Sequence, residues 1–540
     1  MSKAGQAGTQ TNKRRLFAFA LVWCCLLSCA ARAQEAVYRN PVIAGDHPDP
    51  TVLRVGADFW ALVTTGDWAP HFTILHSRDL VDWRTVGAVF GQKPAWAKGD
   101  FWGPELIEDH GQFFLYYTAR RDEGANKRGT LCVAVATAQQ PAGPYTDHGP
   151  VVCQDVGSID PFSLRDETGQ RYLVWKEDGN DRNQPTVIWA QPLSADGLKV
   201  TGKRTSLIRN DVAWERNVVE GAYILPHGGW YYLFYAGNAC CGRACNYAVG
   251  VARARKITGP WTKNPANPII GANDAWQCPG HGDVVTTADG REFYMYHSYR
   301  RSSDTFNIGR ETVLDRITWN DRQWPVVNGA HGPSTAAPAP LGVLAPNNAR
   351  EFFAGFNEAQ LDPEFQWPMN SAQSATVEPQ HGGYLLLTPA RQTAPLDEWT
   401  GAVLGLRVTS GDYVATVALD ATSLQPGARA GLAAYSWRDA AVGIAADREH
   451  VYVWRREGQT QETLATGNAP NAPALYLRMT VAGGETYRFA ASANGRDWTN
   501  VGASINANYI EGAHVALTAA GRAGAPARFD WLRVALAKQP

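Results

Sequence analysis

The sequence lacks an excess of charge of either sign. Its 540 residues include 50 lysines and arginines and 51 aspartates and glutamates, which leaves a formal net charge of -1. Proteins that attract nucleic acid or anionic membranes through long-range electrostatics present a basic field instead. We therefore expect no nucleic-acid partner and no electrostatic attachment to a membrane.

The sequence also offers no convincing membrane span at its N-terminus. The apolar run Leu16–Cys29 is too short to cross a bilayer comfortably. The basic residues Lys13–Arg15 precede it and the small-x-small pattern Ala31–Ala33 follows it, so residues 1–33 are predicted to be a cleaved export signal. The residues ending at Cys29 loosely resemble a lipoprotein box, but we favour a secreted or periplasmic protein over one anchored there.

A zinc site is not indicated either. No CxxC pair with a matching second pair is present, although such pairs are typical of structural zinc sites. Removal of the signal leaves six cysteines, namely Cys132, Cys153, Cys240, Cys241, Cys245 and Cys278. An even number in an exported chain is compatible with disulfides. We predict a Cys132–Cys153 bridge and leave the pairing of the other four open.

Aromatic residues, by contrast, are plentiful, with 20 Trp, 20 Tyr and 18 Phe. They suit either stacking on sugar rings or the filling of β-rich cores. Aromatic strands that follow a turn recur at 55–62, 109–117, 166–175, 227–235 and 288–296. A second strand follows each of them, no helical periodicity is visible, and the spacing suits propeller blades. We predict an all-β protein that begins with a five-bladed β-propeller, with an unclosed series of sandwiches as the alternative.

Acidic residues stand at the openings of several predicted blades. Asp49 opens the first, Asp160 the third and Glu220 the fourth, while His281 stands at the same point of the fifth. The innermost strands of a propeller line its axis, so these side chains are expected to converge. Pro48 precedes Asp49, and a following proline restricts a residue toward an extended backbone. Taken singly, each acid could instead belong to an ordinary turn or strand end.

Converging carboxylates are the machinery of glycoside cleavage. One is protonated and donates to the leaving oxygen, while the other is ionised and activates water or attacks directly. A third anion nearby raises the pKa of the acid by like-charge repulsion. Glu215 competes with Glu220 for the acid role. We prefer Glu220 because it directly precedes Gly221 and the fourth aromatic strand.

The ordered motifs resemble those of glycoside hydrolase family 43. They are Asn40–Ile43 with His47–Pro50, Trp102–Glu105, Gly157–Pro161, Glu220–Gly221, Gly280–Gly282 and Gly309–Thr312. The resemblance implies a five-bladed propeller over residues 35–330 that hydrolyses with inversion of the anomeric carbon. It makes Asp49 the general base, Asp160 the residue that tunes pKa and orients, and Glu220 the general acid.

The same resemblance assigns supporting roles. Arg310 would hydrogen-bond a sugar hydroxyl, because a guanidinium is a fixed fork of donors. Trp68 and Trp102 would be aromatic walls of the sugar pocket, with blade packing as the alternative. His281 would lie beside a structural calcium or other ion, with a hydrogen-bonded core histidine as the alternative. No cofactor is expected for the chemistry itself.

The sequence departs from the family at two places. Ala222–Tyr223 follow Glu220–Gly221 where many members have Pro-His, and the loop Asn238–Cys245 is not general. Both departures bear on the substrate more than on the chemistry.

A second domain is expected after a Pro/Ala-rich linker at residues 331–349. Residues 350–540 contain many short strands separated by turns, which is typical of a β-sandwich. This segment resembles the concanavalin-like domain that follows the propeller in β-xylosidase-type members of the family. An independent carbohydrate-binding module is the alternative.

These observations predict a secreted, inverting glycoside hydrolase with an oligosaccharide or polysaccharide substrate. The expected action is removal of terminal β-D-xylosyl or α-L-arabinofuranosyl residues from hemicellulose, namely xylan, arabinoxylan or arabinan. An endo-arabinanase or a galactan-cleaving relative is the alternative within the family. A retaining fructan-cleaving propeller would need the opening Asn-Asp-Pro-Asn-Gly, which is absent. A non-catalytic sugar-binding propeller is the alternative outside enzymes.

Overall fold

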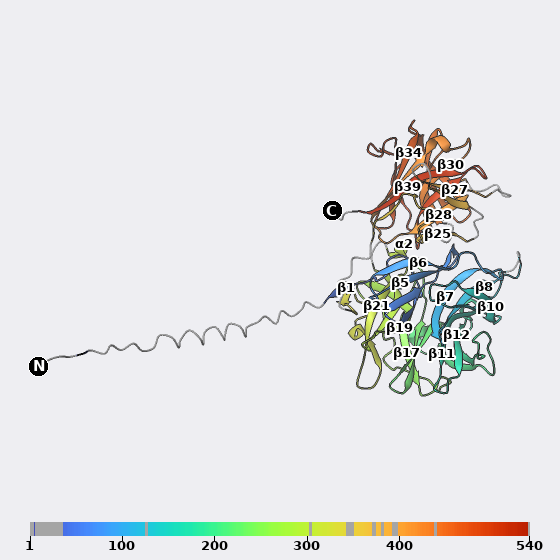
Figure 1. Ribbon diagram of the computed structural model, residues 1–540, viewed down its shortest axis with the longest axis vertical. Coiled ribbons are helices and arrows are strands. Elements are labelled where there is room, and N and C mark those ends of the chain that lie inside the picture. The colour runs from blue at the N-terminus through green and yellow to red at the C-terminus, as the bar shows by residue number, and fades with distance from the viewer. Residues whose placement is uncertain are drawn as a thin grey trace.

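The computed structural model describes residue 5 and residues 36–124, 128–301, 305–341, 350–369, 374–379, 383–390, 398–436 and 440–537. The described chain is almost entirely β-structure and forms two bodies, the first coloured blue to yellow and the second orange to red in Figure 1. No helix in these ranges is long and apolar enough to span a membrane. The predicted export signal, apart from Gly5, lies outside the described residues.

Five four-stranded antiparallel sheets make up most of the first body, as far as the chain is described. The first contains β2 (Thr51–Val55), β3 (Asp58–Leu62), β5 (His71–Ser77) and β6 (Trp83–Phe90). The second contains β7 (Ala97–Asp109), β8 (Gln112–Arg121), β9 (Leu131–Ala138) and β10 (Thr146–Val152). The third contains β11 (Ser158–Arg165), β12 (Arg171–Glu177), β13 (Val187–Pro192) and β14 (Thr205–Arg209). The fourth contains β15 (Val219–His227), β16 (Trp230–Gly237), β17 (Ala248–Ala254) and β18 (Thr262–Lys263), and the fifth β19 (Trp276–Thr286), β20 (Glu292–Arg300), β21 (Glu311–Trp319) and β22 (Pro325–Val327).

The five sheets close into a propeller. The innermost strands β2, β7, β11, β15 and β19 each contact the next around a ring, and β19 returns to contact β2. The aromatic strands come second in each sheet. In β8, for example, the residues from Phe113 to Tyr117 are buried on both faces, because neighbouring blades pack against each side. The predicted five-bladed propeller is confirmed.

A short ribbon joins the two ends of the propeller segment. β1 (Val37–Arg39) pairs antiparallel with β23 (Ala336–Pro338). Part of the segment predicted as a linker therefore forms a strand on the first body. Helical structure in the described residues is limited to α2 (Thr305–Ile308) and four 3-10 turns, namely η1 (Asn180–Arg182), η2 (Ala213–Glu215), η3 (Asn328–Ala330) and η5 (Ala421–Ser423).

The second body is a β-sandwich, as predicted. One sheet contains β24 (Phe352–Ala354), β26 (Ser374–Glu378), β27 (Tyr384–Thr388), β29 (Tyr413–Asp420), β34 (Ala474–Ala482), β35 (Thr486–Ser492), β36 (Thr499–Asn500), β37 (Ile505–Asn506) and β39 (Ala527–Leu536). The other contains β25 (Phe365–Pro368), β28 (Ala402–Arg407), β30 (Arg429–Ser436), β31 (Ala440–Ala446), β32 (His450–Glu457), β33 (Thr460–Asn468) and β38 (His514–Ala520). Buried residues alternate along β34, which places every second side chain in the shared core.

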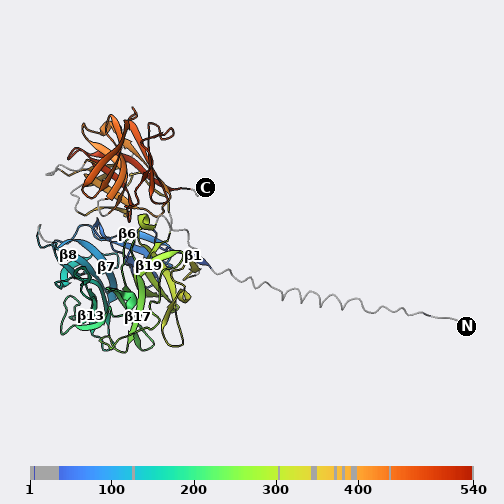
Figure 2. The same cartoon turned by 180° about the vertical axis from the view of Figure 1, so that it is seen from behind.

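The two bodies are joined by strand pairing and by side-chain stacking. β4 (Trp68–Ala69) of the propeller pairs with β25 of the sandwich. The Trp68 indole stacks on His514 with 3.7 Å between ring centroids. Backbone hydrogen bonds also run from Gly512 to Phe306 and from Ala513 to Asn307. Figure 2 shows the sandwich seated on one side of the propeller, so residues of the sandwich can reach the propeller surface near Trp68.

Candidate active site

One residue within or just before each inner strand has a left-handed backbone. These residues are Asp49 (φ 54°), Gly103 (φ 48°), Asp160 (φ 52°), Gly221 (φ 59°) and His281 (φ 37°). Strand pairing is irregular around the four that lie within strands, which indicates a bulge that redirects side chains. The extended backbone expected for Asp49 is therefore wrong. Glu220 also lies one residue before the left-handed position rather than at it, so it is not the strict counterpart of Asp49 and Asp160.

Two of these positions need glycine because the inner strands crowd together. A Cβ at Gly103 would lie 2.9 Å from Asp160 Oδ1, and a Cβ at Gly221 would lie 2.9 Å from His281 Cγ. Real Cβ atoms do not tolerate such approaches, and glycine also adopts positive φ without steric cost. The two glycines therefore allow Asp160 and His281 to reach the centre of the ring.

A cavity of about 490 Å³ lies where the inner strands open. It is lined by all seven residues that the sequence singled out, namely Asp49, Trp68, Trp102, Asp160, Glu220, His281 and Arg310. Residues separated by more than 250 positions, such as Asp49 and Arg310, are thus brought to one pocket. The sequence predicted the membership of this group but not the contacts within it.

Asp49 is held as a carboxylate by cations and donors. Its Oδ1 lies 3.2 Å from Arg310 Nη1, and its Oδ2 accepts a 2.8 Å hydrogen bond from the Thr64 hydroxyl. Burial alone raises the pKa of Asp49, but Arg310, His281 and His297 together outweigh burial and hold it well below its ordinary value. Asp49 is therefore ionised near neutral pH, as a proton acceptor must be.

Asp160 has the opposite electrostatic character. Its Oδ2 accepts a 3.0 Å hydrogen bond from the Gly221 backbone and lies 3.9 Å from His281 Nδ1. Burial raises the pKa of Asp160 to about 6, with His281 opposing the rise and Glu220 adding to it. Two buried carboxyl groups with pKa values displaced in opposite directions provide both a base and a proton store in one pocket.

Glu220 is bonded on both oxygens. Tyr247 donates a 2.9 Å hydrogen bond to Oε1, and Lys176 Nζ lies 2.5 Å from Oε2. Lys176 is itself buried and also bonds Asp178 at 2.8 Å. Burial lowers the pKa of Lys176, but Glu220, Asp178 and Asp160 outweigh burial and raise it, so the side chain stays charged. Lys176 was missed by the sequence analysis, although a lysine inside an aromatic strand is an unusual residue that could have signalled it.

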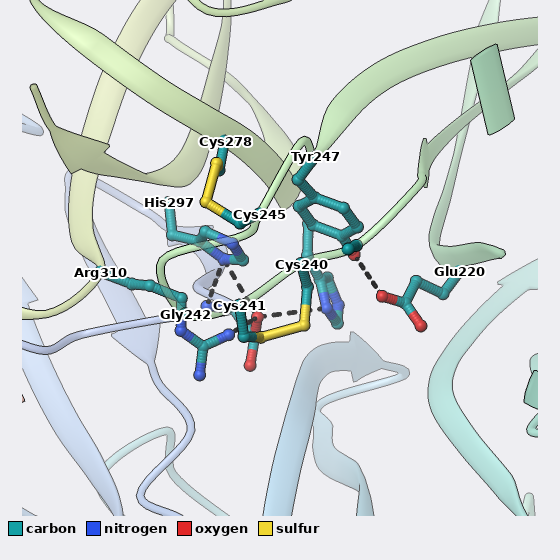
Figure 3. The surroundings of a disulfide bond; sticks show 12 residues. Glu220, Cys240, Cys241, Gly242, Cys245, Tyr247, Cys278, His297 and Arg310 are labelled. Atoms are coloured by element: carbon teal, nitrogen blue, oxygen red, sulfur yellow. Dashed lines mark hydrogen bonds and ion pairs between the residues drawn. A yellow bond between two sulfur atoms is a disulfide. The ribbon is translucent and has the colours of Figure 1, made fainter. Parts of the chain in front are cut away.

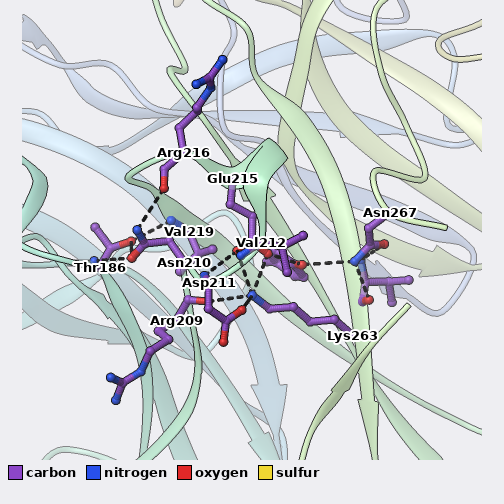
Figure 4. Close-up of polar contacts among 12 residues, drawn as sticks. Thr186, Arg209, Asn210, Asp211, Val212, Glu215, Arg216, Val219, Lys263 and Asn267 are labelled. Carbon is purple, nitrogen blue, oxygen red and sulfur yellow. Dashed lines mark hydrogen bonds and ion pairs between the residues drawn. The ribbon is translucent and has the colours of Figure 1, made fainter. Parts of the chain in front are cut away.

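Glu215, the competing candidate acid, lies elsewhere. It is fully buried beside η2, where its carboxylate accepts hydrogen bonds from Tyr235 and from the backbones of Asp211 and Val212. Lys263 Nζ lies 2.7 Å from Glu215 Oε1, and Figure 4 shows the lysine reaching into this cluster. Glu215 does not line the cavity described above. Its bonds are those of a structural anchor between blades.

The sandwich contributes to the pocket as well. Glu511 and Gly512, just before β38, line the cavity. Glu511 accepts a 2.8 Å hydrogen bond from the Tyr299 hydroxyl, and Asp46 accepts a 2.8 Å bond from the Arg310 backbone. The pocket is therefore built from both bodies. No local sequence pattern marks Glu511, because it reaches the pocket only through the packing of the sandwich on the propeller.

The two predicted aromatic walls differ in their surroundings. Trp68 is buried, and its ring stacks on His514 and meets Tyr435 edge-on, so most of its surface contacts the sandwich. Trp102 is half-buried in the inner strand β7. Both line the cavity, but Trp102 has more free surface for a sugar ring.

His281 faces carboxylates rather than a set of metal ligands. Its Nδ1 lies 3.4 Å from Asp49 Oδ1, and burial is outweighed by Asp160 and Asp49, which raise its pKa. A raised pKa favours the imidazolium, whereas metal binding needs the neutral ring. No group of three or more His, Cys, Asp or Glu side chains in the described residues is arranged to hold a metal ion. His281 itself offers only a ring nitrogen, whereas calcium prefers oxygen ligands, so the predicted calcium beside it stays a prediction and we derive no step through it.

The cysteine pairing adds one confirmation and two findings. Cys132–Cys153 is a disulfide, as predicted. Cys245 pairs with Cys278, and the adjacent residues Cys240 and Cys241 pair with each other. Figure 3 shows the last pair among the polar groups of the pocket.

Comparison with known proteins gives this geometry a context. The family model for glycosyl hydrolases family 43 matches residues 38–325, and the model for the β-xylosidase C-terminal concanavalin A-like domain matches residues 354–535. The chain belongs to glycosyl hydrolases family 43. It is thus a glycoside hydrolase, and the resemblance read from its motifs is confirmed.

The relatives match more than half of the length of this family 43 member. It is 28% identical to xylosidase/arabinosidase 43B of Humicola insolens over 87% of this chain and 90% of that protein. It is 27% identical to the extracellular exo-α-(1→5)-L-arabinofuranosidase ArbA of Cellvibrio japonicus over 58% of this chain and 92% of that protein. The solved structure of the GH43 BlXynB protein of Bacillus licheniformis matches with a TM-score of 0.79, 26% identity and coverage of 93% of this chain and 100% of that chain.

Proposed function

We propose that this family 43 enzyme removes terminal β-D-xylosyl or α-L-arabinofuranosyl residues from hemicellulose oligosaccharides with inversion. The observation that carries the proposal is the meeting of Asp49, Asp160 and Glu220 in one cavity, with pKa values displaced in opposite directions for Asp49 and Asp160. The relatives named as xylosidase/arabinosidase and as exo-arabinofuranosidase support the choice of pentose substrates.

In this mechanism Asp49 accepts a proton from water as the water attacks the anomeric carbon. Glu220 donates a proton to the glycosidic oxygen as the bond to the leaving group breaks. Asp160 accepts a hydrogen bond from the Gly221 backbone, which fixes the residue next to Glu220, and burial keeps Asp160 protonated up to about pH 6. Arg310 fixes the orientation of Asp49 and presents its remaining N–H groups to a sugar hydroxyl.

Export is part of the proposal. The predicted signal at residues 1–33 supports secretion or passage to the periplasm. The three disulfides of the described chain also suit an oxidising compartment. ArbA, a relative that is 27% identical to this chain, is described as extracellular by its name.

The direct test is hydrolysis of a panel of aryl glycosides, followed by NMR of the first-formed sugar. We expect turnover of β-D-xylosides or α-L-arabinofuranosides, no turnover of glucosides or galactosides, and a first-formed anomer opposite to that of the substrate. Large products from arabinan would favour the endo-acting alternative. Retention of the anomeric configuration, or sugar binding without turnover, would contradict the mechanism.

The pH dependence follows from the same carboxyl groups. Burial raises the pKa of Asp160 to about 6, so this carboxyl group loses its proton as the pH rises through this value. Asp49, whose pKa is well below its ordinary value, stays ionised throughout. We therefore expect kcat/KM to fall above about pH 6, with no acidic limb until the fold is lost. A pH profile on one aryl pentoside measures this.

Substitution of Lys176 is expected to shift the pH at which kcat/KM falls on the alkaline side. Lys176→Met removes a cation that bonds Glu220 and lowers the pKa of Asp160, so the alkaline midpoint is expected to move upward by about 1 pH unit or more. Lys176→Arg keeps the charge and is expected to hold the midpoint near the wild-type value. An unchanged or lower midpoint in Lys176→Met, measured on folded protein, would rule out this role.

A further inference from the structure

The pocket contains one surface that the proposed mechanism does not use. The adjacent residues Cys240 and Cys241 form a disulfide, and both line the cavity that contains Asp49 and Glu220. Cys241 is exposed and Cys240 is half-buried. In Figure 3 the two sulfurs lie between Glu220 with Tyr247 on one side and Arg310 on the other. We call Cys240 and Cys241 the sulfur wall.

The sulfur wall is held in place from several directions. A second disulfide, Cys245–Cys278, anchors the end of the same loop to β19. The Gly242 backbone donates a 3.3 Å hydrogen bond to the Tyr299 hydroxyl. Arg243 lies 3.0 Å from Glu485 of the sandwich and also bonds the Asn508 carbonyl. A loop tethered to the propeller and to the sandwich presents its side chains to the cavity in a defined position.

The wall adds apolar surface next to the charged groups of a pocket whose other apolar lining includes Trp68 and Trp102. Cys240 packs in one cluster with the rings of Tyr247 and Tyr299, which also line the cavity. A disulfide has no hydrogen to donate, and its sulfurs are soft and only weak acceptors. The charged groups can hydrogen-bond the hydroxyls of a sugar, but they offer no apolar surface to its C–H groups. Trp68 offers little free surface, because it stacks on His514.

We propose that the Cys240–Cys241 disulfide is the binding surface for the apolar carbon face of the pentose that occupies this pocket. The inference rests on the proposed function, since it places a pentose against Asp49 and Glu220. Burying one or two sugar carbons against sulfur removes apolar area from water, which favours binding. With the disulfide reduced, two independent thiols with separate rotamers would replace the single fixed surface.

The test measures binding of the free monosaccharide, which has no leaving group. The wild type, Cys240→Ala/Cys241→Ala and the matched control Cys132→Ala/Cys153→Ala are compared by competitive inhibition with xylose and arabinose. The control removes a disulfide that joins β9 to the residue after β10. Neither of its two cysteines lines the cavity. The inhibition constant is expected to rise about four- to fifteenfold in the pocket variant only, with a parallel rise in KM and little change in kcat.

If the double variant does not fold, reduction of the Cys240–Cys241 disulfide in the wild-type protein provides a second test. Cys241 and Cys153 are both exposed, so a phosphine can reach the sulfur wall as well as the Cys132–Cys153 bridge. Peptide mapping after thiol alkylation identifies which bridge is open. The same rise in the inhibition constant, reversed by reoxidation, supports the proposal. An unchanged constant with Cys240 and Cys241 reduced overturns it.

The outcomes also separate this inference from the proposed function. A wild type that hydrolyses no pentoside refutes the proposed function before the wall is examined. A wild type that hydrolyses pentosides, with a pocket variant whose monosaccharide affinity is unchanged, refutes only the wall. A rise in KM for aryl substrates with an unchanged inhibition constant for free pentose would also refute the sulfur-wall proposal, because the wall would then contact the leaving group.

Discussion

Asp49→Asn is expected to lower kcat by about 10²–10⁴-fold on aryl pentosides, with little change in KM. The amide cannot accept the proton of the attacking water, whereas it can still accept the hydrogen bond that Thr64 donates in the wild type. Arg310, now beside a neutral group, retains its position through the bond from its backbone to Asp46. Steady-state kinetics on the purified variant, with a thermal unfolding curve, measure the effect.

The matched control for this substitution is Asp321→Asn. Asp321 is exposed in the turn between β21 and β22, at the outer edge of the fifth blade. It undergoes the same chemical change without reaching the cavity, so its kcat should equal that of the wild type. If Asp49→Asn retained more than a tenth of wild-type kcat while still inverting the anomer, Asp49 would not be the base.

Glu220→Gln is expected to show a loss that depends on the leaving group. For a substrate whose leaving group needs a proton, such as xylobiose, kcat/KM should fall by about 10²–10⁴-fold. A dinitrophenyl glycoside leaves without protonation and should lose far less. Gln can keep the bond from Tyr247, which limits structural disturbance. The ratio of kcat/KM values for the two substrates is the measurement that identifies a general acid.

Glu215→Gln is the informative comparison, because the same change is made at the last residue of η2, four residues before the inner strand β15 begins. Glu215 bonds Lys263 and Tyr235 in a buried cluster away from the cavity. Weakening hydrogen bonds to a buried charge should lower the free energy of unfolding by about 2–3 kcal/mol. The leaving-group ratio should stay at the wild-type value. A leaving-group dependence in Glu215→Gln but not in Glu220→Gln would reverse the assignment of the acid.

Local sequence patterns were sufficient for the architecture. Turns rich in glycine and aspartate, followed by aromatic strands at a regular spacing, predicted the five blades, because each blade repeats the same local structure. Many short strands separated by turns after residue 350 predicted the sandwich, because strands and turns are also local features of the sequence. The acids that open the blades were found because a propeller brings the starts of its inner strands to one axis.

The sequence did not predict which side chains contact one another around the propeller axis. Pro50 suggested an extended Asp49, but Asp49 has a left-handed φ of 54° just before the inner strand β2. Glu215 and Glu220 are close in sequence, yet a turn at η2 directs one into a buried cluster and the other into the cavity.

The sequence by itself therefore determined that this protein is a β-propeller followed by a β-sandwich, with three acids at blade openings, since those features repeat within short stretches of chain. Only the tertiary structure decided that Lys176 bonds Glu220, that the adjacent cysteines form a wall of the pocket and that Glu511 arrives from the sandwich. Those contacts join residues that are distant in sequence or choose among several possible partners. Their geometry depends on how blades and domains pack, which no local pattern encodes.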